Sequence, residues 1–312
     1  MAGKCTLLKA SLANTPIYFM LLFQIPASVA KRIEQLKRNF LWSSSAETKK
    51  IHLVSQKQIC SDKKKGGLGI RDIRKQNWAL LRKWWWRLAD NENQLWTQVI
   101  RSKYKISSQK WLPKTDSYST RSGIWKTLIS ILPYFELNEL FLPLSRTDSI
   151  IWSPSSSRRF SMASFYRVLV EATASASQSN RAWNSIAPPR TKLFQWLAFQ
   201  GNPLTLDNLQ KRAFQFPNRC IMCLSEEETV THLLLHCYFA YSIWSQTTQL
   251  FGLSWVLPHS VQALLLLSFE DSFRKSGKIL WKASVATILC HIWGERNSKI
   301  FRGKMNTPHT TF

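Results

Sequence analysis

Apolar residues recur at helical spacing along most of this 312-residue chain. One series opens at Pro26 and returns every three or four positions as far as Leu41. Another follows Asp72, a residue type that caps helices, and continues to about Ala89. Near the end of the chain, residues 257–300 have the spacing typical of two further helices. The pattern therefore predicts a mainly α protein.

One stretch near the middle of the chain breaks this helical pattern. Ser149–Trp152 is typical of a short strand, Ser153–Ser157 of a turn, and Arg158–Phe160 of a returning strand. We therefore predict one β-hairpin. Ser161 follows it directly and is expected to cap the next helix, as Thr205 is expected to cap a later one.

The cysteines and histidines are concentrated in residues 220–237, which hold three of the six Cys and two of the six His. Cys220 and Cys223 form a C-x2-C pair that can place two thiolates on one ion from a tight turn. Thr231 can cap a helix that carries the remaining candidates, His232, His236 and Cys237. Two ligands from a turn and two from a helix suit a tetrahedral zinc ion.

The sequence therefore predicts a structural Zn2+ site, because four protein ligands leave no open position for water. The predicted ligands are Cys220, Cys223, His232 and Cys237, with His236 as the alternate. Mixed nitrogen and sulfur ligands favour zinc over iron. The other interpretation is an ordinary buried helix, since Leu233–Leu235 are apolar. That interpretation does not account for the C-x2-C pair in a chain otherwise poor in cysteine.

The chain is strongly basic, with 43 Lys and Arg against 18 Asp and Glu and a formal net charge of +25. Such a balance indicates a polyanionic partner, most often nucleic acid, with a membrane surface as the alternative. The charge is concentrated between Lys31 and Arg87, where 16 basic and 4 acidic residues lie. A solvated face on ordinary helices is the other interpretation of this run.

We predict sequence-nonspecific contact with RNA, DNA or both within this basic segment. Lysines beside Gly66 and Gly67, and cations among Trp84–Trp86, suit a surface that follows a phosphate backbone and stacks bases. The predicted contact residues are Lys63, Lys64, Lys65, Arg71, Arg74, Lys75, Arg82 and Lys83. By contrast, Glu226–Glu228 make the loop around the first two predicted ligands acidic (residues 220–228, the zinc loop), so nucleic acid is not expected there.

The cysteine pattern indicates a reducing compartment rather than a disulfide framework. The apolar run from Pro16 to Ile25 is too short to span a bilayer and is closed by Pro26. It also lacks the small-residue cleavage site of a signal peptide. We therefore expect an intracellular, nuclear protein that has no membrane partner.

Several motifs, taken together, point to one protein family. They are Phe160–Tyr166, Trp183 with Pro188–Pro189, Lys192–Leu197, Thr205–Arg212, and the candidate ligands with Phe239–Ala240 and Trp244. Over about residues 145–250 the chain resembles the reverse transcriptase zinc-binding domain of plant non-LTR (LINE-type) retrotransposons. The resemblance implies Cys-Cys-His-Cys ligation, which favours Cys237 over His236.

Upstream motifs resemble the segment that follows the polymerase palm in the same open reading frames. They are Pro16–Tyr18, Ile25–Pro26, Phe40–Trp42, Gly66–Ile70 and Asn77–Trp84. The resemblance implies a helical thumb- or connection-like region, followed by a small zinc-stapled helical domain with one β-hairpin. We therefore predict four consecutive segments: a basic helical region at 1–110, a helical connector at 111–147, the zinc-binding domain at 148–250, and C-terminal helices with a frayed tail at 251–312.

The polymerase chemistry of that family is not expected in this chain. Such polymerases need an aspartate pair to hold two metal ions, and no Asp-Asp dipeptide occurs anywhere in the sequence. Asp148, Asp207 and Asp271 are isolated and are expected to be caps, turns or surface residues. The remaining cysteines are expected to be structural: Cys5, Cys60 and Cys290.

The expected function is that of a zinc-binding, nucleic-acid-binding remnant or fragment of a retrotransposon reverse transcriptase, without enzymatic activity of its own. Two alternatives stay open. In the first, the chain is an accessory part of an RNA-directed DNA polymerase that works only with a palm domain in cis or in trans. In the second, it is a structural zinc domain that docks on other protein, and its charge is incidental.

Overall fold

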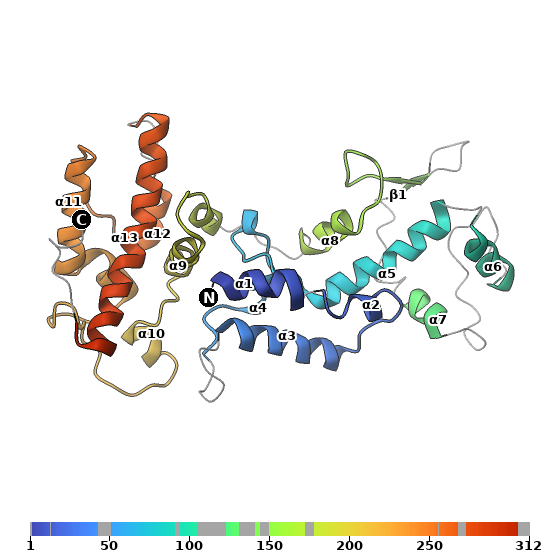
Figure 1. Ribbon diagram of the computed structural model, residues 1–312, viewed down its shortest axis with the longest axis horizontal. Coiled ribbons are helices and arrows are strands. Elements are labelled where there is room, and N and C mark those ends of the chain that lie inside the picture. The colour runs from blue at the N-terminus through green and yellow to red at the C-terminus, as the bar shows by residue number, and fades with distance from the viewer. Residues whose placement is uncertain are drawn as a thin grey trace. The chain divides into compact units, whose positions relative to one another are not determined.

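The structure is a computed structural model whose described residues are mainly helical, as predicted (Figure 1). The described residues are 2–12, 14–42, 51–90, 94–104, 123–130, 141–143, 150–171, 178–254, 256–267 and 273–304. Most of the predicted connector at 111–147 and the tail beyond Lys304 lie outside them. No described helix combines the length and the apolar character that crossing a bilayer requires.

The described elements are helices and two short strands. In chain order they are α1 (Ala2–Leu7), η1 (Leu8–Leu12), α2 (Ile17–Met20), α3 (Ala27–Trp42), α4 (Gln56–Cys60), η2 (Lys63–Lys65), α5 (Ile73–Asp90), α6 (Leu95–Tyr104), α7 (Gly123–Ser130), β1 (Phe141–Pro143), β2 (Ile150–Trp152), α8 (Met162–Glu171), η5 (Gln178–Trp183), α9 (Pro189–Phe199), α10 (Leu206–Gln210), η6 (His232–His236), α11 (Tyr238–Leu250), α12 (Val261–Leu266) and α13 (Lys275–Arg302).

The chain forms two compact units, each assembled from separate stretches of sequence. Unit 1 comprises Met1–Cys5, Leu41–Gly69 and Ser175–Phe312, and unit 2 comprises Thr6–Phe40 and Ile70–Ala174. Lysines 63–65 and the candidate zinc ligands therefore belong to the same unit. The four consecutive segments expected from the sequence are a division along the chain and stay a prediction.

Unit 2 is organised around α5, which packs against α2, α7 and α8. The predicted cap is confirmed, because Asp72 Oδ1 accepts the backbone N–H groups of Arg74 and Lys75 at 2.9 and 3.0 Å. Along the inner face of α5, Trp85 is buried and donates its indole N–H to the Leu128 carbonyl. The helical spacing of the apolar residues thus builds the core that the sequence indicated.

The predicted hairpin of residues 149–160 is wrong, although its first strand exists. That strand, β2, pairs antiparallel with β1, which precedes it, in the register Phe141 to Trp152. The chain does turn back after β2, and the Trp152 N–H donates to the Arg158 carbonyl. Arg158 then adopts φ 54°, which ends the extended conformation, and Phe160 stacks on Trp86 instead of extending a ladder.

The next helix begins where the sequence predicted. Ser161 Oγ accepts the Ser164 backbone N–H at 3.0 Å, which satisfies one of the free donors in the first turn of α8. The predicted cap at Ser161 is therefore confirmed. Phe165 follows one turn later and is fully buried against Trp152, so α8 is held both by its cap and by its apolar face.

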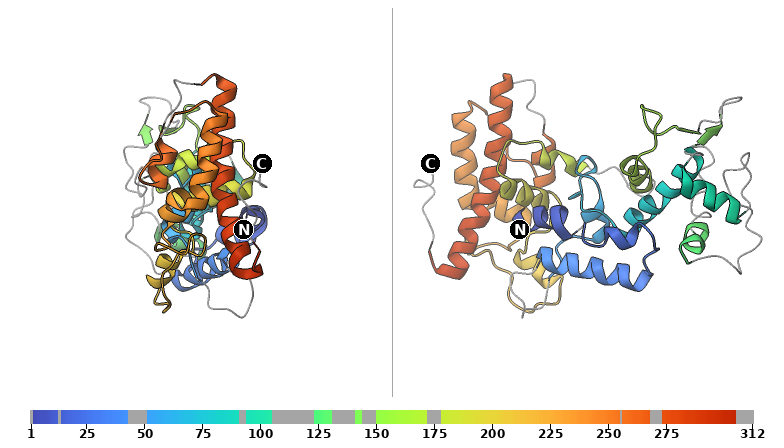
Figure 2. Two further views of the ribbon diagram at one scale, coloured as in Figure 1. Left: turned by 90° about the vertical axis from the view of Figure 1, so that its left-hand side faces the viewer. Right: turned by 45° about the vertical axis from the view of Figure 1, so that its right-hand side comes forward.

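Unit 1 is built around α13, which packs against α9, α11 and η6. Figure 2 shows α11 and α13 side by side. Their facing surfaces bury Trp244, Leu289 and Ile292 in one apolar cluster. Cys220 and Cys237 belong to the same cluster and are fully buried. The metal ligands expected from the sequence therefore lie inside the main core of this unit.

Candidate metal centre

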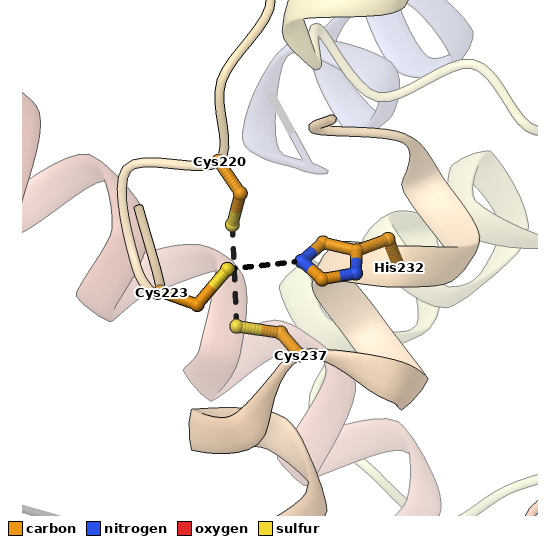
Figure 3. A group of neighbouring side chains, drawn as sticks. All are labelled: Cys220, Cys223, His232 and Cys237. Carbon is orange, nitrogen blue, oxygen red and sulfur yellow. Dashed lines mark hydrogen bonds between the residues drawn. The ribbon is translucent and has the colours of Figure 1, made fainter. Parts of the chain in front are cut away.

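Four side chains of unit 1 converge on one point, and they are the four ligands predicted from the sequence (Figure 3). The ligand atoms of Cys220, Cys223, His232 and Cys237 all lie within 4.8 Å of one another. Figure 3 shows the two cysteines of the turn on one side and the helical ligands on the other. The cluster therefore offers three sulfur atoms and one imidazole nitrogen to a single ion.

The distances within the cluster fit a tetrahedral zinc ion. The sulfur atoms of Cys220 and Cys237 are 3.9 Å apart, and Cys223 Sγ lies 3.4 Å from His232 Nε2. Zinc–sulfur bonds of about 2.3 Å and zinc–nitrogen bonds of about 2.0 Å place such atoms roughly 3.5–3.8 Å apart in a tetrahedron. Both separations lie within a few tenths of an ångström of these values, so the site suits structural Zn2+.

A tight turn positions the first two ligands. The Leu224 N–H donates to the Cys220 carbonyl at 2.8 Å, and the Cys220 N–H donates to the Glu226 carbonyl at 2.7 Å. Leu224 adopts φ 58°, the left-handed conformation that lets the backbone reverse within so few residues. The C-x2-C spacing therefore brings both sulfur atoms to the same side of the turn.

A π-helical turn, η6, positions the other two ligands. The Cys237 N–H donates to the His232 carbonyl, so residues five apart in sequence lie one above the other. In an ordinary α-helix the residue above His232 would be His236, four positions along. The wider turn instead directs Cys237 to the metal and leaves His236 exposed. The structure thus resolves the alternate ligand in favour of Cys237.

The helix that carries His232 is capped differently from the prediction. Thr231 lies within the helix and makes no capping bond, whereas Thr229 Oγ1 accepts the His232 N–H at 3.0 Å. The predicted cap at Thr231 is therefore wrong by two residues. The cause is that the helix starts earlier, since the Leu233 N–H already donates to the Thr229 carbonyl.

This geometry predicts a difference between the two histidines. Replacing His232 by alanine should release the zinc, because one of the four ligand atoms is removed. His236→Ala should keep full zinc content, because that imidazole points to solvent. Zinc measured per mole of purified protein checks both. If His236→Ala loses the metal while Cys237→Ser keeps it, the ligand assignment is wrong.

The pKa values of two of the three cysteine thiols favour metal binding. The hydrogen bond with Cys237 lowers the pKa of Cys220 to about 5, although burial acts in the opposite direction. The same contact, together with burial, raises the pKa of Cys237. Burial alone would raise the pKa of Cys223, but hydrogen bonds with Ser225 and His232 outweigh it and lower that pKa. Thiolate is the form that binds zinc, so two of the three sulfur ligands are already biased toward it.

A carboxylate stands behind the histidine ligand. Glu226 Oε2 lies 2.8 Å from His232 Nδ1, on the side of the ring opposite the cluster. The contact is an ion-pair distance only, because Nδ1 forms no hydrogen bond within the described residues. The Glu226 side chain is largely exposed, so this contact contributes only a weak, solvent-screened attraction to the histidine.

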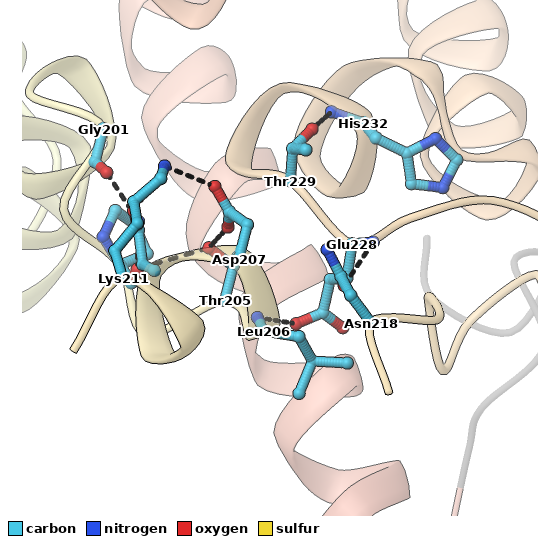
Figure 4. Close-up of polar contacts among 11 residues, drawn as sticks. Gly201, Thr205, Leu206, Asp207, Lys211, Asn218, Glu228, Thr229 and His232 are labelled. Carbon is cyan, nitrogen blue, oxygen red and sulfur yellow. Dashed lines mark hydrogen bonds and ion pairs between the residues drawn. The ribbon is translucent and has the colours of Figure 1, made fainter. Parts of the chain in front are cut away.

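The zinc loop is anchored within unit 1 by a buried ion pair between Glu228 and Arg296. Figure 4 shows Glu228 with two of its other contacts, Leu206 and Asn218. Glu228 is fully buried, and its Oε1 accepts from Arg296 Nη2 at 2.6 Å and from the Leu206 N–H at 3.0 Å. Asn218 Oδ1 accepts the Glu228 backbone N–H at 2.9 Å. One carboxylate therefore links the zinc loop, the start of α10 and helix α13.

Two sequence expectations change at this anchor. Thr205 occupies the N-cap position of α10 as predicted but makes no capping bond, because its hydroxyl donates to Asp207 Oδ1 while Glu228 accepts the first helical N–H. The loop is also less acidic at its surface than its sequence indicates, because only Glu226 and Glu227 are exposed. The sequence did not reveal that Arg296 pairs with Glu228, because the two residues lie 68 positions apart and no local pattern connects them.

The lysine loop, residues 62–67, is held firmly on unit 1. Asp62 Oδ1 accepts the Lys64 N–H, and the Gly66 carbonyl accepts from Trp196 Nε1 at 2.7 Å and from Ser179 Oγ at 3.0 Å. Gly66 has φ 79°, and a Cβ there would lie 1.8 Å from Ser179 Oγ. The glycine is thus required for close contact with η5, and the loop presents Lys63 and Lys64 to solvent.

The predicted contact residues on α5, in unit 2, are not all at the surface. Arg71 and Arg74 are exposed, whereas Lys75 and Lys83 are half-buried. Lys75 Nζ donates to the Leu169 carbonyl at 3.0 Å. Arg82 is buried, so its side chain is not at the surface, and burial lowers its pKa to about 10. It lies on the face of α5 that packs into the core, which helical spacing alone did not reveal.

The comparisons with known proteins agree with this geometry. Residues 160–244 match the protein family described as zinc-binding in reverse transcriptase. The chain is similar to the Arabidopsis thaliana protein At1g65750, which bears the provisional name of a ribonuclease H protein, with 28% identity over 96% of this chain and 60% of that protein. It is also similar to AtMg00310, an uncharacterized mitochondrial protein of the same plant, with 33% identity over 28% of this chain and 58% of that protein.

The chain thus spans about 60% of the length of the first of these relatives. The family match covers all four residues of the cluster and the elements that hold them, from α8 to α11. Geometry and family similarity therefore agree on the same ligands. Residues 160–244 form a zinc-binding domain of the reverse transcriptase type, with Cys220, Cys223, His232 and Cys237 as its Zn2+ ligands.

Proposed function

We propose that the chain binds RNA or DNA without sequence specificity, and that the lysine loop of unit 1 is the main contact. The observation that carries this proposal is the mounting of the loop through Gly66, with the side chains of Lys63 and Lys64 exposed. A fixed group of cations gains more from a phosphate backbone than a mobile one, because less conformational entropy is lost on binding. The net charge of +25 supports a polyanionic partner in the nucleus.

The proposed surface excludes the tip of the zinc loop. Glu226 and Glu227 are exposed there and would repel phosphates. Zinc then has a structural role, since four protein ligands complete its coordination. The metal would hold the domain on which η2 is mounted, and the lysines would make the contact.

Replacing Lys63, Lys64 and Lys65 together by alanine should weaken binding to every strand tested. For each phosphate that the variant no longer binds, the slope of log affinity against log salt should also fall by about 0.7–0.9, depending on strandedness. Fluorescence anisotropy of a labelled oligonucleotide at several salt concentrations measures both effects. Zinc content should not change, because none of the three side chains touches the cluster.

Glu227→Gln is the matched control, because it alters an exposed charge of unit 1 outside the lysine loop. We expect unchanged or slightly tighter binding from it. If the triple lysine variant binds like the parent protein at all salt concentrations, the nucleic acid lies elsewhere and the proposed surface is wrong.

We further propose that the chain is a remnant or fragment of a plant non-LTR retrotransposon reverse transcriptase that performs no nucleotidyl transfer alone. The sequence contains no Asp-Asp dipeptide to hold two metal ions. A second candidate function is that of an accessory part of a polymerase, acting with a palm domain in cis or in trans. The observation that favours it is that At1g65750 extends well beyond the part similar to this chain.

A further inference from the structure

Unit 1 contains a cavity that lies apart from the zinc ligands. It has a volume of about 180 Å³ and is enclosed by η5 with the loop after it, α9, α12 and the first turns of α13. One water molecule needs only about 10–15 Å³ on the same scale, so the cavity can hold a small organic group. Neither the zinc cluster nor the lysine loop contributes to its walls.

Two polar atoms in this cavity are buried without a partner. Gln195 is 3% exposed and Ser185 is 8% exposed, and both side chains line the cavity. Gln195 Oε1 and Ser185 Oγ form no hydrogen bond within the described protein. Buried polar groups in native proteins are nearly always paired, so these two atoms point to a polar ligand or to water in the cavity.

Other residues that line the cavity are aromatic and apolar. Trp281 and Phe273 line the cavity, with ring centroids 6.2 Å apart. Phe251 packs edge-to-face against Trp281, with ring centroids 5.2 Å apart. Leu264 and Val285 also line the cavity. Aromatic side chains such as these can stack on a planar ring, and the polar lining residues can pair with its edge.

Among the lining residues that the structure describes there are three cations and no carboxylate. They are Arg181, Lys278 and Lys282. Arg181 is held in place, because its Nη1 donates to the Leu266 carbonyl at 2.7 Å. The described walls therefore combine an apolar ring site, amide and hydroxyl groups, and positive charge, which together match a base and its phosphate.

The cavity is also adjacent to the lysine loop through one short helix. Helix η5 packs against η2 on one side and against α12 on the other. Lys63 Nζ lies 5.0 Å from the centre of the Trp183 ring at the end of η5, and Arg181 of the same helix lines the cavity. A strand that follows the lysines would therefore pass close to the cavity.

From these contacts we infer that the cavity binds one nucleotide unit, with the base against Trp281 and Phe273 and the phosphate near Lys278 and Lys282. Gln195 and Ser185 would pair with the edge of the base. This inference rests on the proposed nucleic-acid binding and adds the position at which a single base is taken up. A free nucleotide has the same chemistry as a unit of a strand, so the test includes both.

The test compares three probes on the zinc-loaded chain: a ten-nucleotide adenine strand, an abasic strand of equal length, and AMP. The adenine strand should bind at least about fivefold more tightly than the abasic strand, since stacking on an aromatic side chain has that size. Gln195→Met keeps the side-chain length and removes the amide, so this advantage should fall while the abasic affinity stays constant. Ser185→Leu should have the same effect by filling the cavity.

Lys275→Ala is the matched control, because this lysine lies on α13 outside the cavity and is exposed. Zinc content confirms that each variant is folded. Equal affinity for adenine and abasic strands in the parent protein would overturn the cavity assignment and leave the proposed function intact. Binding of none of the three probes would contradict both, whereas AMP binding without strand binding, abolished in Gln195→Met, would identify a free nucleotide as the occupant and contradict only the proposed function.

Discussion

Cys220→Ser is expected to release the zinc and to unfold residues 200–250, with the largest effect of any single substitution in this chain. Cys220 is fully buried and holds the turn that also presents Cys223. Zinc binding and local folding are coupled, and the apparent binding free energy in small zinc domains is roughly 10–16 kcal/mol. Losing one ligand should therefore cost more than the roughly 10–100-fold in affinity that a residue orienting a ligand contributes.

Two measurements check this result. Zinc content should fall to background, and amide hydrogen exchange should accelerate over η6 and the first turns of α11. Cys290→Ala is the matched control, because Cys290 lies at the edge of the same core but outside the cluster. Normal metal content and normal protection in Cys220→Ser would show that this sulfur is not a ligand.

Arg296→Met is expected to destabilise the zinc-loaded protein by about 3–5 kcal/mol, the usual cost of leaving one charge of a buried pair alone. Glu228 is fully buried, and after the substitution its carboxylate would keep only the Leu206 N–H. Urea unfolding followed by far-UV circular dichroism measures the change. The zinc should stay bound under native conditions, because Arg296 touches no ligand.

A second variant separates the effect of charge pairing from that of packing. Glu228→Gln combined with Arg296→Met removes both charges and should recover part of the stability. Arg302→Met, at the exposed end of the same helix, should stay within about 0.5 kcal/mol of the parent protein. Equal effects of Arg296→Met and Arg302→Met would mean that the pair does not anchor the zinc loop.

The metal centre could be predicted from the sequence because its signal is local. Cys220 and Cys223 are close enough in sequence to share one turn, and the remaining candidates follow within fourteen residues. The choice between His236 and Cys237 needed the structure, because it depends on whether the helix turns with four or five residues. A π-helical turn costs hydrogen-bond quality, and here it is found where it aligns a sulfur with the metal.

The surface was harder to predict than the core. Helical spacing correctly indicated α3, α5 and α13, because apolar faces repeat with the helix. The same spacing did not show that Arg82 lies on the inner face of α5, since a lone cation among tryptophans can face either way. Gly66 and Gly67 stand beside lysines that suit a phosphate backbone, but the sequence did not show that Gly66 allows the backbone to approach Ser179 and Trp196.

By itself, the sequence determined the helical class, the caps at Asp72 and Ser161 and the zinc ligands Cys220, Cys223 and His232, because each depends on residues within a few turns of one another. Only the tertiary structure decided that residues 41–69 join the zinc-binding segment in one unit, and that Glu228 pairs with Arg296. It also decided that β2 pairs with the strand before it. The physical reason is the same in all three cases: burial and pairing between residues far apart in the chain depend on packing, which no local pattern encodes.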